Sequence, residues 1–110
     1  MSIQHKELAS GRWLSLTLME QLANVGSEIE RTIKWKQKGN SEYSAKAFDR
    51  ALELLDLTIQ DVKNRLRLKE ILRVREALAD HFVFENSYKT TETSWQKYFL
   101  GFTYAARVRR

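Results

Sequence analysis

The chain has 110 residues, with 19 lysines and arginines against 14 aspartates and glutamates, and a formal net charge of +5 at pH 7. This length suits one domain around a single core, and the absence of cysteine from the sequence excludes disulfides, thiolate metal sites and a cysteine nucleophile. No run of residues is apolar for long enough to cross a bilayer, and the first residues lack the apolar core of a signal peptide, so we expect a soluble, cytoplasmic protein.

With no proline and only four glycines, the chain favours helices, and we predict the first over residues 12–38. Apolar residues recur there at steps of three and four, at Leu14, Leu18, Leu22, Val25, Ile29 and Ile33. Gly26 interrupts this segment, and Ser27 with Glu30 resembles a capping box that would start a new helix. Because the apolar stripe keeps its phase across Gly26, we expect one unbroken helix.

A turn at Gly39-Asn40 leads into the second predicted helix, residues 41–60. Residues 32–60 also resemble one tetratricopeptide repeat, through Trp35, Gly39, Asn40, Tyr43, Phe48, Ala51, Leu52, Leu55 and Ile59. That resemblance implies a protein-binding hairpin with its turn at residues 44–47. Those four residues favour a helix, whereas Gly39 and Asn40 supply a C-terminal glycine cap and an N-cap, so we predict the turn there.

The third predicted helix covers residues 62–83 and directs Leu68, Leu72 and Phe82 towards the core. The fourth covers residues 94–107, where Thr93 and Gln96 give a start signal. Its apolar stripe is heavy in aromatic residues, at Trp95, Tyr98, Phe99 and Phe102. Four helices with short connections predict an all-α, antiparallel four-helix bundle that forms one domain over residues 1–110.

Apolar residues spread widely around the first two predicted helices, more widely than a small bundle needs. Either these helices are sandwiched inside one chain, or a second subunit covers the surplus. We predict a homo-oligomer. The expected interface consists of Trp13, Leu16, Met19, Leu54 and Leu57.

Six basic residues between positions 63 and 75 surround a single acid, Glu70. Arg65, Lys69 and Arg73 follow one another at four-residue steps, a spacing that could track a phosphate backbone. The predicted nucleic-acid-binding residues are Lys63, Arg65, Arg67, Lys69, Arg73, Arg107, Arg109 and Arg110. The alternative is a solvated helix face whose bases pair with acidic residues of the second helix.

Arg75 and His81, with five residues between them, stand near the end of the third predicted helix. This pair resembles the Arg-x(4–6)-His motif of HEPN-domain ribonucleases, small and often dimeric helical proteins that cut RNA without a metal. The resemblance implies that His81 is the general acid or base on the ribose hydroxyl, that Arg75 holds the scissile phosphate, and that Glu76 occupies the polar position after the arginine. Val83 stands where that family often has a tyrosine. The alternative is a histidine that bonds free carbonyls at a helix end.

The sequence contains neither a glycine-rich phosphate loop nor a His-Glu-x-x-His or Glu-x-x-His pair, so we expect no metal and no cofactor. The leading prediction is a non-enzymatic, homo-oligomeric adaptor or accessory protein that binds RNA, DNA or a ribonucleoprotein. In fold and charge it looks like the small basic bundles that serve as accessory proteins of diversity-generating retroelements. The alternatives are the HEPN-like ribonuclease and the tetratricopeptide-like hairpin.

Overall fold

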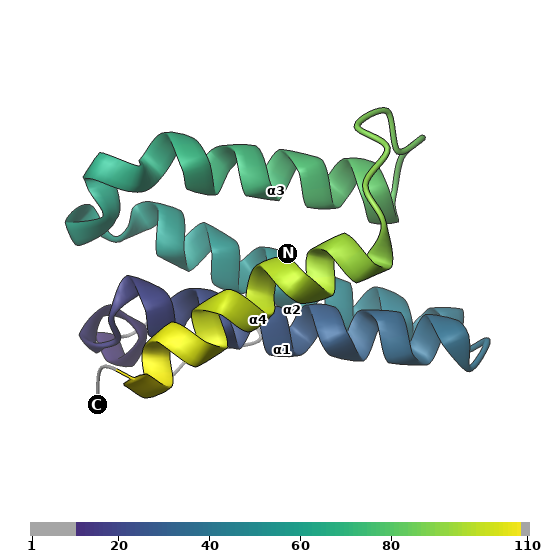
Figure 1. The fold of residues 1–110 in the computed structure, drawn as a ribbon, viewed down its shortest axis with the longest axis horizontal. Helices are drawn as coiled ribbons and strands as arrows, with labels where there is room; N and C mark the ends of the chain where they lie inside the picture. Colours follow the sequence, from purple (N-terminus) through teal and green to yellow (C-terminus); the bar gives the residue numbers. More distant parts are fainter. Residues whose placement is uncertain (1–10, 109–110) are drawn as a thin grey trace.

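The computed structural model describes residues 11–108. Within this range the chain forms α-helices and short 3-10 helices, with no strand. The α-helices are α1 (Leu18–Gln37), α2 (Ser41–Gln60), α3 (Leu68–Phe82) and α4 (Glu92–Val108), and the 3-10 helices are η2 (Trp13–Ser15) and η3 (Val62–Arg67). The four α-helices pack against each other, which confirms the predicted all-α fold (Figure 1). No helix in the described range combines the length and the apolar character that a membrane span requires.

α1 and α2 lie side by side, and each is covered by one further helix of the same chain (Figure 1). α4 packs across α1, and α3 packs on α2. The first two helices are therefore sandwiched internally, which accounts for much of their surplus apolar surface. Trp13 and Leu54, which we expected at a subunit interface, are buried in this core instead. Leu16, Met19 and Leu57 are partly exposed, and their place in an interface stays a prediction.

The start of the first helix differs from the prediction. Residues 13–15 form a 3-10 turn, Leu16 has an extended backbone, and α1 begins only at Leu18. Thr17 and Glu20 form the capping box that the sequence reading missed, with side-chain to backbone bonds of 2.9 and 3.2 Å. The break before α1 is what lets Trp13 fold back against the core. Beyond it, α1 runs through Gly26 without interruption, as predicted.

The turn between α1 and α2 lies where Gly39 and Asn40 predicted it. Gly39 has a φ of +78°, a conformation that glycine adopts readily. The side chain of Asn40 accepts a hydrogen bond of 2.9 Å from the Tyr43 amide at the start of α2. Residues 44–47 are helical, so the break that a tetratricopeptide repeat needs is not there. The prediction of a tetratricopeptide-like hairpin with its turn at residues 44–47 is therefore wrong.

The last two helices also begin differently from the prediction. Residues 62–67 form a 3-10 helix, and α3 proper begins at Leu68. Leu72, expected in the core, is 47% exposed on the outer side of α3. α4 begins at Glu92, because Thr91 and Ser94 cap each other through two bonds of 3.0 Å and Thr93 is not the capping residue.

Candidate nucleic-acid interface

A buried network of polar side chains anchors the start of the basic segment. Gln21 on α1 donates hydrogen bonds to the Asp61 carboxylate (2.8 Å) and to the Trp13 carbonyl (3.1 Å). Asn64 on η3 donates to the side-chain oxygen of Gln21 (2.8 Å) and to the Thr58 carbonyl (3.0 Å). These bonds join η2, α1, α2 and η3. The network therefore fixes where the basic segment leaves the bundle.

Three of the six bases between positions 63 and 75 are paired with carboxylates. Lys63 contacts the Asp61 carboxylate, which belongs to the buried network. The remaining pairs are Arg67 with Glu70 at 2.8 Å and Arg75 with Asp56 of α2 at 2.8 Å. The pair with Asp56 agrees with the alternative given by the sequence, in which bases of this segment pair with acids of the second helix. Half of the positive charge of this segment is thus neutralised within the fold.

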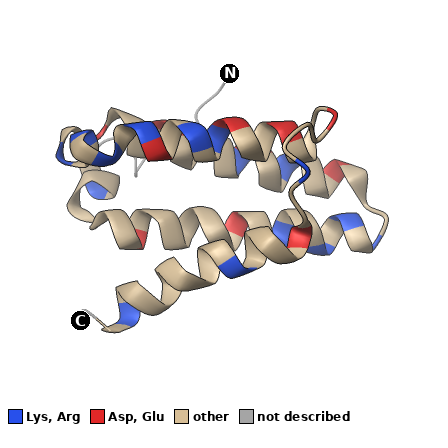
Figure 2. Ribbon diagram, turned by 45° about the horizontal axis from the view of Figure 1, so that its top comes forward, with Lys and Arg blue, Asp and Glu red and all other residues tan. Residues whose placement is uncertain are grey.

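The other three bases are Arg65 on η3 and Lys69 and Arg73 on α3, which we call the basic ridge. All three are exposed, and none forms an ion pair with a carboxylate in residues 11–108. Lys69 and Arg73 lie four residues apart on α3, about 6 Å along the helix axis. Figure 2 shows basic residues along η3 and the first half of α3. The predicted ridge is therefore present, with Lys63 and Arg67 engaged elsewhere.

The arginines of the C-terminal region do not extend the ridge. Arg107 lies on α4, beside a hollow that it lines together with Leu16, which precedes α1, and Glu20 in the first turn of α1. It is exposed, but it belongs to a different helix from the ridge (Figure 2). Arg109 and Arg110 lie outside the described residues.

The ribonuclease-like residues are directed to different neighbours. Arg75 and His81 are six positions apart, which places them about 120° from each other around α3. The Arg75 guanidinium bonds Asp56 on α2, whereas Nδ1 of His81 lies 2.9 Å from the Thr90 hydroxyl. Glu76 accepts a bond of 2.9 Å from a tyrosine of the following loop. The structure does not bring these groups around one point, and the bond to Thr90 replaces the helix-end carbonyls suggested for His81.

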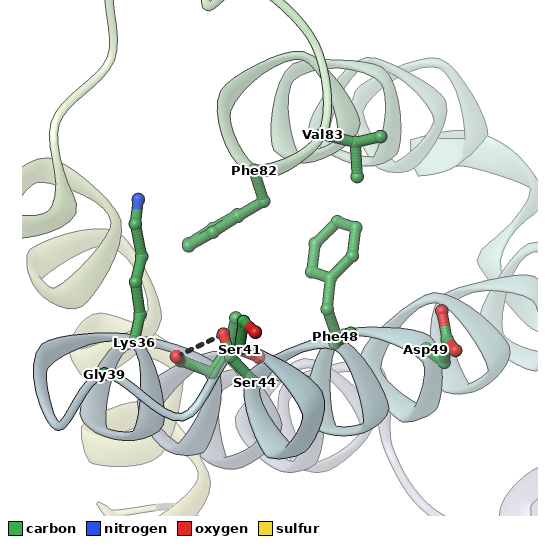
Figure 3. Close-up of a pocket in the computed structure, with 10 residues that line it drawn as sticks. Lys36, Gly39, Ser41, Ser44, Phe48, Asp49, Phe82 and Val83 are labelled. Atoms are coloured by element: carbon green, nitrogen blue, oxygen red, sulfur yellow. Dashed lines mark hydrogen bonds between the residues drawn. The ribbon is translucent and has the colours of Figure 1, made fainter.

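A groove of about 370 Å³ opens between the α1–α2 turn and the end of α3 (Figure 3). The rings of Phe48 and Phe82 line it, with 5.2 Å between their centroids. The Lys36 ammonium lies 5.8 Å from the Phe82 ring centroid and 3.6 Å from Glu92. The Ser44 hydroxyl donates to a backbone carbonyl. This mainly apolar lining, with the Lys36 and Ser44 groups engaged and the carboxylate of Asp49 at its edge, suits an apolar group better than a phosphate.

The buried network should make the free energy of unfolding fall at acid pH, through the titration of Asp61. Burial alone would raise the pKa of Asp61, but hydrogen bonds from Lys63 and Gln21 outweigh it and hold that pKa below its usual 3.8. A carboxylate whose pKa is lowered by folding contributes stability above its unfolded pKa and loses it as the pH falls through the folded value. We therefore expect the stability advantage of the wild type over Asp61→Asn to shrink below about pH 4. Urea unfolding of both proteins from acid to neutral pH measures it, and a constant difference would contradict this account.

Comparison of the chain with protein-family models, curated proteins and solved structures found no match. The geometry and charge of the basic ridge are therefore the basis for the function proposed next.

Proposed function

We propose that the protein is a non-enzymatic accessory protein that binds nucleic acid through the basic ridge. The observation that carries this proposal is the division of the basic segment into paired and unpaired residues. Arg65, Lys69 and Arg73 are exposed and form no ion pair with the described residues, on a surface that the buried network holds in place. Phosphate groups at successive positions of one strand would supply those counter-charges.

The proposed binding follows the phosphate backbone and is weakly selective for sequence. Base stacking requires accessible aromatic rings beside the positive surface. The rings of Trp95 and Phe99 are buried in the core, and the exposed ring of Tyr88 is held at Glu76, whose carboxylate repels phosphate. We therefore expect single-stranded RNA and DNA of different sequences to bind with similar affinities.

Removing the ridge charges should weaken RNA binding and flatten its salt dependence. We expect the triple variant Arg65→Gln, Lys69→Gln, Arg73→Gln to lose about 2 from the slope of log affinity against log salt, because each phosphate contact on a single strand contributes about 0.7. Fluorescence anisotropy of a labelled single-stranded RNA, measured from about 50 to 200 mM salt, gives this slope.

A matched control separates the ridge from the net charge. The variant Lys34→Gln, Lys38→Gln, Lys46→Gln removes the same number of charges from exposed positions on α1, the turn and α2. It should keep most of the slope. Equal losses in both triple variants, or no RNA binding by the wild type at about 50 mM salt, would refute the proposal.

A further inference from the structure

The outer face of α3 carries opposite charges on its two halves. The basic ridge occupies η3 and the first half, and Glu76 and Asp80 follow on the second half (Figure 2). At about 100° per residue, Lys69, Arg73, Glu76 and Asp80 fall within an arc of roughly 60°. They therefore form one continuous strip along the helix.

The acidic half of the strip is held in a defined position by the loop that follows α3. The Glu76 carboxylate accepts a bond of 2.9 Å from the Tyr88 hydroxyl. Asp80 accepts bonds from the backbone amides of Ser87 (2.9 Å) and Tyr88 (3.0 Å). The bond from the Tyr88 amide, the largest cause, holds the pKa of Asp80 below its usual value. Both acids thus present fixed negative charge beside the positive half.

Exposed apolar side chains accompany this strip along its length. Leu72 lies between the two charged halves, and Leu66 on η3 is 99% exposed. Val62 at one end and Val83 at the other are also exposed. Single exposed apolar residues are ordinary, but several along one charged strip indicate an interaction surface.

We propose that this strip pairs with the same strip of a second copy of the chain, with the two α3 helices antiparallel about a two-fold axis between Leu72 and Arg73. In that register Lys69 meets the partner's Glu76, and each such pair occurs twice because a two-fold interface uses the same patch on both copies. Towards the ends, Arg65 lies near the partner's Asp80. At the centre, Leu72 faces the partner's Arg73 and lies one residue along the axis from its own symmetry mate.

Charge complementarity favours a second copy of the chain over a nucleic acid as the partner of the whole strip. A phosphate backbone satisfies the basic half but would bring Glu76 and Asp80 close to like charges. A second copy supplies an acid for Lys69 and for Arg65 and a base for Glu76 and for Asp80 in one register, while Arg73 lies beside the two-fold axis with no acid opposite it. Pairing would also cover the basic ridge, so dimer formation and the proposed nucleic-acid binding would exclude each other. Dimerisation itself does not rest on the proposed function, and its test contains no nucleic acid.

Charge reversal tests the pairing. Sedimentation velocity at low salt, over a range of protein concentrations, gives the association constant of each variant. Lys69→Glu and Glu76→Lys should each weaken self-association at least about tenfold, since a close interfacial charge pair contributes about 1.5 kcal/mol or more. The double variant should recover wild-type association, because its charges are complementary again. An equimolar mixture of the two single variants should form heterodimers.

Two further variants keep the test decisive. Glu76→Gln preserves an acceptor for the Tyr88 hydroxyl and removes only the charge, so it should weaken the dimer without disturbing the loop. Lys97→Glu changes an exposed charge on α4, away from the strip, and should leave association unchanged. A wild-type protein that stays monomeric at every concentration would overturn the proposal. So would a double variant as weak as the single ones while circular dichroism shows intact helices.

Discussion

Replacing Gln21 with leucine is expected to lower the free energy of unfolding by about 3 to 6 kcal/mol, because several buried groups lose a partner at once. Gln21 is fully buried and bonds Asp61, the Trp13 carbonyl and Asn64. Leucine fills a similar volume but offers no hydrogen bond, and each buried polar group left unsatisfied costs about 1 to 3 kcal/mol. Urea unfolding followed by circular dichroism measures the change.

The control for this substitution lies on the same helix. Gln37 is exposed in the last turn of α1, so Gln37→Leu makes the same chemical change without breaking the network. It should alter stability by less than about 0.5 kcal/mol. If Gln21→Leu proved as mild as this control, the network would not be what holds η3 in place.

Replacing Gly26 with alanine is expected to reduce stability by about 1 to 3 kcal/mol, the usual range for overpacking a core. A Cβ atom at this position would lie 2.6 Å from Cβ of Phe99, so α1 and α4 approach too closely there for any side chain. Helix propensity alone predicts the opposite sign, a gain of about 1 kcal/mol. Thermal or urea unfolding therefore separates the packing effect from propensity by its sign.

Gly101 provides the matched comparison within α4. It is a helical glycine with open space around its Cα, so Gly101→Ala should raise stability by about 1 kcal/mol through helix propensity. A gain in stability from Gly26→Ala similar to that of Gly101→Ala would show that α1 and α4 do not pack as described. Combining Gly26→Ala with Phe99→Gly, which removes that Cβ, should cost less than the sum of the two changes, because both act at one contact.

Local signals predicted the parts of the fold that local chemistry decides. Gly39 and Asn40 meet the backbone and capping needs of a tight helix connection, and the turn lies there. The steady apolar stripe across Gly26 correctly indicated one helix. Residue spacing also identified the basic ridge, because its members depend only on helix geometry and exposure.

The predictions made from the sequence were wrong where contacts between distant residues decide the structure. Trp13 looks like the first residue of a helical stripe, but its indole donates a bond of 3.2 Å to the Thr58 hydroxyl, 45 positions away. No local pattern encodes that bond. Gln21 gave one available signal, since it lies on the apolar face of α1 between Leu18 and Val25, where a polar residue implies a buried partner.

Only part of the candidate site was predicted, because the rest depends on how distant residues pack. Spacing could show that Arg65, Lys69 and Arg73 share a face, but the neutralisation of Arg75 by Asp56 depends on how α3 packs against α2. The resemblance to the motif of HEPN-domain ribonucleases rested on the number of residues between Arg75 and His81, which does not determine where the two side chains point. In the structure Arg75 turns towards α2 and His81 towards Thr90.

An amide NMR titration of the chain with single-stranded RNA tests the central claim most directly, since a protein of 110 residues suits residue-by-residue mapping. The account predicts that chemical-shift changes centre on residues 62–73, around the basic ridge, and fade as salt rises. Shifts confined to the groove beside Phe48 and Phe82, or a spectrum that RNA leaves unchanged at low salt, would contradict it.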